Sequence, residues 1–295
     1  MLDLLGVRGD DVRVLDPRGH PWLIETRDGP AVLRVVSASV GLAHVRWLHR
    51  FLERLATTGF PAPRPLPLLA GRSQARVDGM IWATLSYLPG RMAGWDPRVS
   101  LASAGALLAR FHQASLVVSP ARQRPGALPM EVCRPRSEHA LVARFQGELV
   151  RSGHAARTRC VLHGDCTTAN LLVDDGGREV VAMIDFALAH LGPPESDISF
   201  GLWVNGRLEQ PAIALDAQRI RHFVAGYHRV RRLEDWAIGA IPRYLVGRGL
   251  QMLLRQERAG VVDPIQVRRL HWLDEHRGWL EEVVASALAS GAAMW

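Results

Sequence analysis

The first ninety residues alternate between hydrophobic and polar positions, as short β-strands do. Strands are predicted over 11–15, 22–26, 31–36 and 80–87. Between the third and fourth of these strands, apolar residues recur at threes and fours over 41–57, which predicts an amphipathic helix. The proline-rich stretch 60–67 that follows is expected to be extended, because proline cannot continue a helix. The chain therefore begins with a small β-rich region that contains one helix.

A helical pattern, with a period near 3.6 residues, dominates from about residue 100 onward. Helices are predicted over 101–116, 198–205, 216–230, 235–257 and 264–288. No internal repeat, low-complexity tract or long linker interrupts this part. The pattern predicts an α+β chain in which a small β-rich region precedes a larger, mainly helical one.

The composition is that of a globular protein with a substantial core. The 295 residues are enough for two packed domains, and 48% of them are hydrophobic. We expect a cytoplasmic protein without a membrane partner, because no apolar run would span a bilayer and the start does not resemble a signal peptide. Three cysteines without metal-ligand spacing suit a reducing compartment.

The net charge is +7, and every basic side chain apart from histidine is arginine, because the sequence contains no lysine. A task usually given to an ammonium group must therefore be done by guanidinium. The arginines are spread along the chain, and no basic run is interleaved with aromatic residues. We therefore expect no nucleic-acid partner.

Residues 163–185 carry the candidate chemistry. The segment His163-Gly164-Asp165-Cys166-Thr167-Thr168-Ala169-Asn170 is followed by Ile184-Asp185-Phe186. Between them, 171–173 and 180–184 read as strands, and 174–177 reads as a hairpin turn. The hairpin would bring Asp185 back beside Asn170, so that the oxygen atoms of three side chains share one space of the size of a metal ion.

These residue types match what phosphoryl transfer requires. Asp165 is expected to accept the proton of the attacking hydroxyl, or to orient that hydroxyl. Asn170 and Asp185 are expected to hold Mg²⁺ against nucleotide phosphates, because magnesium takes one or two protein ligands besides phosphate oxygens and water. The opposing interpretation is that these polar groups only satisfy one another in buried turns.

Two further residues of this region are interpreted as structural support. His163 is expected to brace the loop through a hydrogen bond to the backbone or to the second carboxylate. Asp197 is expected to cap the helix that follows it and to bond the catalytic loop.

The pattern of His-Gly-Asp, four residues, Asn and then Ile-Asp-Phe resembles that of the aminoglycoside phosphotransferase and choline kinase group. These are small-molecule kinases with a protein-kinase-like fold. The resemblance implies a bilobal molecule, with a β-rich nucleotide-binding N-lobe at 1–88 and a larger, mainly helical C-lobe at 89–295. It also implies ATP and Mg²⁺ as cofactors, although nothing in the residues distinguishes ATP from GTP.

The resemblance assigns further residues to the nucleotide. The adenine is expected to bond the backbone between Ser86 and Leu88. Arg34 stands where many relatives have a lysine that contacts the phosphates, and a guanidinium can grip phosphate in a bidentate manner. The acidic partner of that cation is expected at Leu48, where this chain has an apolar residue instead.

The leading functional hypothesis is an ATP-dependent kinase acting on a hydroxyl of a small molecule, with an antibiotic or other natural product among the candidate acceptors. Sugars and amino alcohols are further candidates, and the role would be in resistance or biosynthesis. Candidate acceptor-binding residues in the helical part are Trp203, Asn205, Trp236, Tyr244, Arg248 and Gln251. The sequence does not determine the oligomeric state.

Two other classes remain to be tested against this hypothesis. A kinase-fold binding module without transferase activity is favoured by Leu48 and by the single Gly19 in the phosphate loop. The complete set of Asp165, Asn170 and Asp185 argues against such a module. A protein kinase is disfavoured, because only eleven residues separate Asp185 from Asp197 and leave no room for an activation loop.

Overall fold

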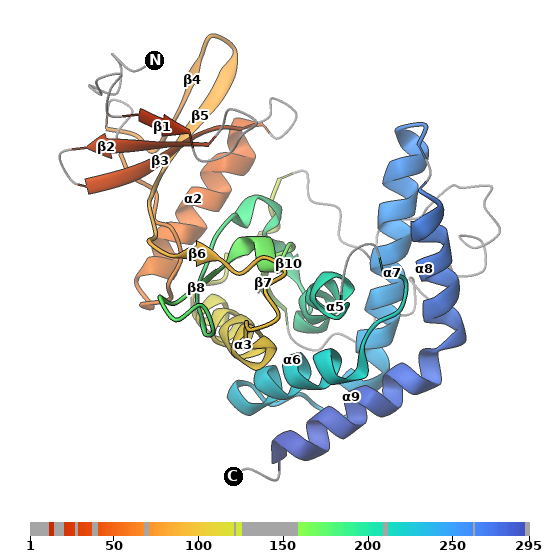
Figure 1. Ribbon diagram of the computed structural model, residues 1–295. Coiled ribbons are helices and arrows are strands. Elements are labelled where there is room, and N and C mark those ends of the chain that lie inside the picture. The colour runs from red at the N-terminus through yellow and green to blue at the C-terminus, as the bar shows by residue number, and fades with distance from the viewer. Residues whose placement is uncertain are drawn as a thin grey trace.

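The computed structural model describes residues 12–14, 21–26, 29–36, 41–67, 71–120, 122–125, 159–208, 212–261 and 263–292. A small antiparallel sheet with one helix precedes a larger helical part, and the two lie at opposite ends of the molecule (Figure 1). The phosphate loop around Gly19 lies outside these described residues.

The small sheet has five antiparallel strands in the order β1-β2-β3-β5-β4. Its strands are β1 (Val12–Val14), β2 (Trp22–Thr26), β3 (Gly29–Val36), β4 (Gln74–Val77) and β5 (Met80–Ser86). On one face Ile24, Ala31 and Leu33 form a cluster, beside which Trp22 and Trp82 stack with ring centres 5.6 Å apart. The strands predicted from alternation are all present, and β4 is an additional strand.

One helix, α2 (Leu42–Ala56), packs against the opposite face of this sheet. Its Val45 joins Ile81 and Ala83 of β5 in an apolar cluster. Because side chains alternate along a strand, residues 81 and 83 face the helix while Trp82 faces the other side. The helix predicted over 41–57 is confirmed, and each of its ends lies within one residue of the predicted end.

Six helices form most of the remaining part that the structure describes. They are α3 (Leu101–Val118), α5 (Pro194–Asn205), α6 (Ala217–Val230), α7 (Ala237–Arg258), α8 (Pro264–Glu275) and α9 (Arg277–Ala292). The helices α3 and α6 approach very closely, because each has a glycine at the contact. A Cβ atom on Gly105 would overlap the backbone oxygen of Phe223, and one on Gly226 would overlap that of Ala102. This close packing fixes α3 against α6, which matters for the site below.

Among the described residues, α3 is the one helix long and apolar enough to cross a membrane, with a mean hydropathy of 1.2. In the structure, however, much of its surface is covered by protein. Leu107, Leu108 and Phe111 are fully buried in the main hydrophobic core, and His112 is fully buried beside them. These contacts are those of a core helix.

Two helix boundaries differ from the sequence prediction. The single helix expected over 264–288 is two helices, because the chain turns at His276, whose backbone amide and ring Nδ1 both bond the Trp272 carbonyl. The helix expected from residue 198 begins at Pro194, where proline is favoured because a first-turn amide needs no partner. The turn at His276 lets α9 lie across α6 (Figure 1).

Short strands and turns before and after α3 carry the predicted motif or pair with it, and all but β6 lie between α3 and α5. They are β6 (Arg91–Met92), β7 (Cys160–Leu162), the 3-10 turn η3 (Thr168–Asn170), β8 (Leu171–Val173), β9 (Val180–Met183), the 3-10 turn η4 (Phe186–Leu188) and β10 (His190–Gly192). The expected hairpin is formed by β8 and β9, and β6 pairs with β8 on its other side. The pair β7–β10 lies next to it in Figure 1.

Candidate active site

The loop between β7 and η3 begins with a tight turn at Gly164. This residue has φ 78°, a conformation in which a side chain is strained. A Cβ atom at this position would also overlap the backbone oxygen of Leu188. Only glycine therefore lets the loop pass this close to η4, and the turn positions the next residue, Asp165.

His163 braces this loop from the inside. Its Nδ1 accepts a hydrogen bond from the Asp165 amide at 3.2 Å, so the ring proton lies on Nε2 and is donated to the Ile184 carbonyl at 2.9 Å. The ring is fully buried and lies 4.6 Å from that of Phe186. His163 thus joins the loop that carries Asp165 to the segment that carries Asp185.

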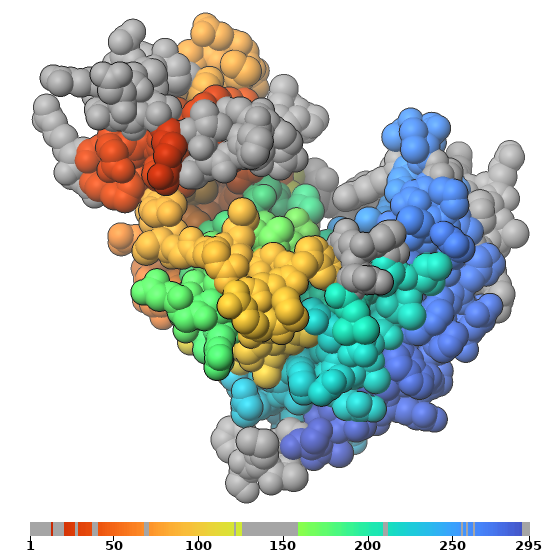
Figure 2. Space-filling model, viewed as in Figure 1, coloured from red at the N-terminus to blue at the C-terminus, as the bar shows by residue number. Residues whose placement is uncertain are grey.

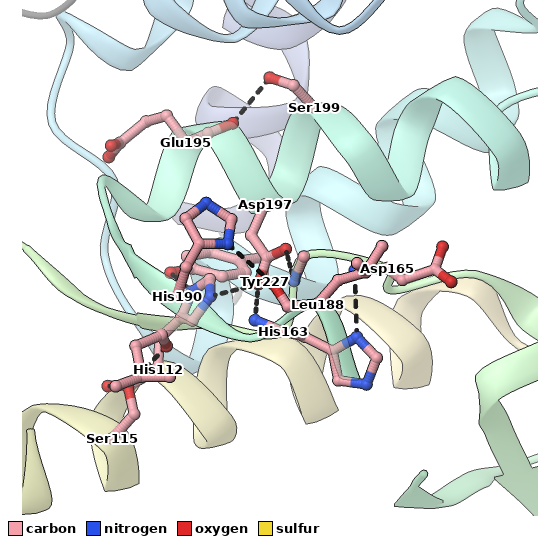
Figure 3. Close-up of polar contacts among 12 residues, drawn as sticks. His112, Ser115, His163, Asp165, Leu188, His190, Glu195, Asp197, Ser199 and Tyr227 are labelled. Carbon is pink, nitrogen blue, oxygen red and sulfur yellow. Dashed lines mark hydrogen bonds and ion pairs between the residues drawn. The ribbon is translucent and has the colours of Figure 1, made fainter. Parts of the chain in front are cut away.

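Asp197 holds the same loop from the helical side. Its fully buried carboxylate accepts the amides of His163 at 2.7 Å and of Gly164 at 2.9 Å (Figure 3). The Nε2 of His112 on α3 lies 3.1 Å from the same carboxylate. Burial alone would raise the pKa of Asp197, but these hydrogen bonds outweigh it and hold that pKa below its ordinary value. The helix cap expected at Asp197 is absent, because Pro193 occupies the capping position and Asp197 lies inside the first turn.

The support extends to α6 through two residues that the sequence analysis did not single out. Burial lowers the pKa of His112, so the ring is neutral. It donates from Nε2 to Asp197 and accepts the Tyr227 hydroxyl at Nδ1, 2.7 Å away. Tyr227 in turn accepts a hydrogen bond from Arg231. A polar residue amid the apolar pattern of α3 was the one signal in the sequence that could have indicated this role.

Asp165 and Asn170 are in direct contact. The Asn170 amide nitrogen donates to the backbone oxygen of Asp165 at 2.9 Å and to its carboxylate Oδ2 at 3.1 Å. Figure 3 shows the Asp165 carboxylate pointing away from the buried network around Asp197. Burial raises the pKa of Asp165 above its ordinary value, although the charge of Arg248 opposes this. A half-buried carboxylate of raised pKa suits proton acceptance.

Asp185 lies beside Asn170, because the Ile184 amide bonds the Asn170 backbone oxygen at 2.9 Å. Its own backbone is left-handed, with φ 57°, which turns the side chain out of the β9 direction. The carboxylate forms an ion pair of 3.0 Å with Arg34 on β3. Burial would raise the pKa of Asp185, but the charge and hydrogen bond of Arg34 outweigh it, so that pKa lies below its ordinary value.

The donor set fits a magnesium ion. Because both hydrogen bonds of the Asn170 side chain use its nitrogen, the Oδ1 atom has no partner among the described residues. Asp185 directly follows Ile184, whose amide bonds the Asn170 backbone, and it supplies an ionised carboxylate. No group of three or more His, Cys, Asp or Glu in the described part of the chain could hold a metal. One carboxylate and one amide suit magnesium, which retains water and phosphate oxygens.

Arg34 has a different partner from the one that the resemblance implied. Leu48 of α2 packs against the apolar core, so the usual carboxylate position is filled by a hydrophobic contact. The Arg34 guanidinium instead pairs with Asp185, and both groups are partly exposed, at 29% and 45%. The cation therefore lies at the mouth of the candidate metal site.

The expected adenine position contains one available backbone group. The Ser86 amide already donates to the Arg64 carbonyl at 2.7 Å, so it is engaged within the protein. The Leu88 amide, in contrast, has no hydrogen-bond partner within the described ranges. Leu88 is thus the member of this pair whose N–H could bond a base.

Three of the six candidate acceptor residues are buried. Trp203 and Tyr244 are core residues with exposures of 1% and 2%. Asn205 is also buried, and it holds the catalytic loop by accepting the Thr168 amide and donating to the Cys166 carbonyl, each at 3.0 Å. These three residues are therefore structural, in contrast to the expected acceptor role.

Arg248 of α7 is the candidate acceptor residue whose charge acts on the site. Its guanidinium lies 3.8 Å from the centre of the Phe200 ring, and its positive charge opposes the rise in the pKa of Asp165. Figure 2 shows the surface hollowed between the β-rich part and α7, with residues of the β7–η4 region at its floor. Arg248 therefore places a positive charge within reach of Asp165.

We expect the free energy of unfolding to fall as the pH drops from about 6.5 toward 4. Burial lowers the pKa of His44 to about 4, with the charge of Arg124 adding to the effect. Burial also lowers the pKa of His49 to about 4, aided by Arg34. The stability conferred by the neutral rings is complete above their ordinary pKa of 6.5, and it is lost as the pH falls through the folded value.

Urea unfolding at about pH 7.5, 6 and 5 measures this loss. The variant His49→Gln should show a shallower decline than the wild type. The control His222→Gln, which changes an exposed histidine of α6, should leave the decline unchanged. A wild-type stability that is flat across this range would contradict the assignment of neutral buried rings.

Comparisons with known proteins agree with this geometry. The sequence profile described as "Phosphotransferase enzyme family" matches residues 19–233. A homoserine kinase of Acidiphilium cryptum (strain JF-5) is 25% identical over 254 residues, which are 79% of this chain and 75% of that protein.

Two solved structures of small-molecule kinases have a similar fold. Amicoumacin kinase hAmiN, in complex with AMP-PNP, Ca²⁺ and Ami, aligns with a TM-score of 0.70 at 18% identity, over 94% of this chain and 89% of that one. A microcompartment-associated aminopropanol kinase aligns with a TM-score of 0.66 at 20% identity, over 94% and 93%. These alignments confirm the predicted kinase-like α+β fold.

Proposed function

The chain belongs to the phosphotransferase enzyme family, whose members include small-molecule kinases, and from this we propose that it transfers the γ-phosphate of ATP to a hydroxyl group of a small molecule. The observation that carries the proposal is the contact of Asn170 with both Asp165 and the Asp185 segment. This contact supports a single site in which Asp165 would accept the proton and Asn170 and Asp185 would hold the metal.

Asp165 is the group that receives or orients the acceptor hydroxyl. Its raised pKa makes it a better base than an exposed carboxylate, and its contact with Asn170 fixes its direction. Because phosphoryl transfer depends mainly on position and charge, the rigid support from His163 and Asp197 is part of the proposed mechanism.

Asn170 and Asp185 are the proposed magnesium ligands. A bound magnesium would neutralise the phosphate charge that develops during transfer. Arg34, in contact with Asp185, supplies a cation that could bind the phosphates in a bidentate manner, and the Leu88 amide is the proposed contact for the base. We propose that the enzyme works in the cytoplasm, as expected from its sequence.

The positive charge of Arg248 beside Asp165 favours an acceptor that carries a carboxylate over a polycationic one. Hydroxy amino acids therefore rank first, and amino alcohols, which lack the carboxylate but carry only one positive charge, rank before aminoglycosides. The names of the homoserine and aminopropanol kinases among the similar proteins support the same order. An antibiotic or other natural product without several positive charges is a second acceptor class for this site.

Incubation with radiolabelled ATP and Mg²⁺ tests the proposal. The acceptor panel contains homoserine, aminopropanol, an aminoglycoside and amicoumacin, and label transfer to the acceptor is measured. We expect transfer to homoserine or aminopropanol, abolished by a chelator and by Asp165→Ala. If ATP with Mg²⁺ binds but no label moves to any acceptor, the chain is instead a nucleotide-binding module of kinase fold.

A further inference from the structure

Two arginine side chains are buried against the same tryptophan in the helical part. Arg207 follows the end of α5 and is 2% exposed, and its guanidinium lies 4.7 Å from the centre of the Trp203 ring. Arg269 of α8 is 7% exposed and lies 6.0 Å from the same ring. Two positive charges are therefore held together in the interior, a placement that is unfavourable without a compensating anion.

The protein supplies little compensation for these charges. Within the described residues, the Arg207 guanidinium has neither a carboxylate partner nor a hydrogen-bond acceptor, and its Nε atom is fully buried. Arg269 donates from Nε to the Ala212 carbonyl at 3.1 Å, and the charge of Asp263 compensates part of the cost of its burial. Burial, together with the charge of Arg269, lowers the pKa of Arg207 to about 9. Stacking on Trp203 offsets only part of this cost.

A third polar group lies next to the arginine pair. Gln266 is one turn before Arg269 on the same side of α8 and is 6% exposed. Its Oε1 atom is buried and lacks a donor among the described residues. The cluster thus combines guanidinium donors with one buried acceptor oxygen that receives no hydrogen bond from the described residues. A partly protonated oxyanion such as hydrogen phosphate has the complementary groups, namely several acceptor oxygens and one O–H.

We infer that Arg207, Arg269 and Gln266 form a binding site for a phosphate-type oxyanion, separate from the nucleotide site. The anion would be bonded by both guanidinium groups and would donate its proton to Gln266. Inorganic phosphate and the phosphate group of a small metabolite share this chemistry. Binding would also fix the end of α5, where Asn205 holds the backbone of the catalytic loop two residues before Arg207.

Thermal unfolding of the full chain in phosphate-free buffer tests this inference. Inorganic phosphate and glycerol 3-phosphate are added separately, with chloride at equal ionic strength as reference. We expect at least one of them to raise the wild-type Tm by about 2 °C or more in a saturable manner. Comparing the Tm shift caused by inorganic phosphate with that caused by glycerol 3-phosphate distinguishes the two sources of the anion.

The variant Arg207→Met gives the decisive comparison. Because it removes a buried charge without a partner, its Tm without anion should equal or exceed that of the wild type, and the anion response should be lost. Arg269→Gln should lose the response as well, so the test does not depend on one variant. Arg243→Met changes an exposed arginine of α7 and should respond as the wild type does.

Binding at the nucleotide site is excluded with Arg34→Met, which should keep the response. This outcome does not depend on catalysis, so the inference and the proposed kinase activity can fail independently. The inference is overturned if neither probe shifts the wild-type Tm beyond chloride. It is also overturned if Arg207→Met lowers the Tm and keeps the anion response, because Arg207 would then serve only to pack against Trp203.

Discussion

Replacing Asp165 by asparagine should lower kcat by about 10²–10⁴-fold, the usual contribution of a general base. The substitution keeps the size of the side chain but removes the group that receives or orients the acceptor proton. Nucleotide binding should change little, because Asn170 and Asp185 stay in place. Steady-state kinetics, together with titration calorimetry of the nucleotide, measure the two effects separately.

Asp175→Asn is the matched control for this variant. It makes the same chemical change at an exposed residue of the β8–β9 turn and should leave kcat unchanged. Burial raises the pKa of Asp165, so the wild-type rate should also fall on acidification at a pH above that of an ordinary carboxyl group. A kcat for Asp165→Asn within about threefold of the wild type would rule out the proposed role.

Replacing Asp197 by asparagine should destabilise the protein by about 2–5 kcal/mol, because a hydrogen bond to a charged group contributes about 1.5–3 kcal/mol and a buried donor left without an acceptor costs about 1–3 kcal/mol. The carboxylate accepts two backbone amides and the His112 ring in a fully buried place. An asparagine has only one acceptor oxygen, and its amide nitrogen would face another donor. Urea unfolding measures the loss, and kcat should fall as well, because His163 and Gly164 position Asp165.

Glu195→Gln provides a close comparison on the same helix. Glu195 is also buried, but one of its carboxylate oxygens lacks a partner among the described residues, and burial raises its pKa. Neutralising this group removes an unfavourable buried charge, so the cost should be small or absent. If both variants lose the same stability, the loss would reflect disturbance of α5 in general, and the assigned role of Asp197 would be wrong.

The local pattern of the chain was enough to predict the parts that position the site. The β8–β9 hairpin follows from two apolar runs around an Asp-Asp-Gly-Gly turn, and the structure has it where expected. The family predicted from the motif around Asp165 and Asp185 is confirmed by the matching profile. The domain boundary at residue 88 and the roles of the site residues stay predictions.

Contacts between residues far apart in the sequence could not be predicted from the local pattern of hydrophobic and polar residues. The bond between His112 and Tyr227 joins positions 115 residues apart, and each residue alone reads as part of an amphipathic helix. Asn205 looked like a binding residue because it is polar, yet its contacts are to the backbone of a distant loop. The break at His276 likewise depends on packing around Trp272, which helical periodicity does not encode.

In the proposed site, the ion pair between Arg34 and Asp185 would make binding of the metal ion and binding of the nucleotide depend on each other. A divalent ion that binds alone would be repelled by the positive charge of Arg34, and a nucleotide that binds alone would be repelled by the negative charge of Asp185. When both bind together, a phosphate would replace the carboxylate beside Arg34. The metal ion would replace the guanidinium beside Asp185, so each side chain would keep a neighbour of opposite charge. In the proposed site, the ion pair would therefore favour binding of the complete magnesium–nucleotide complex over binding of either component alone.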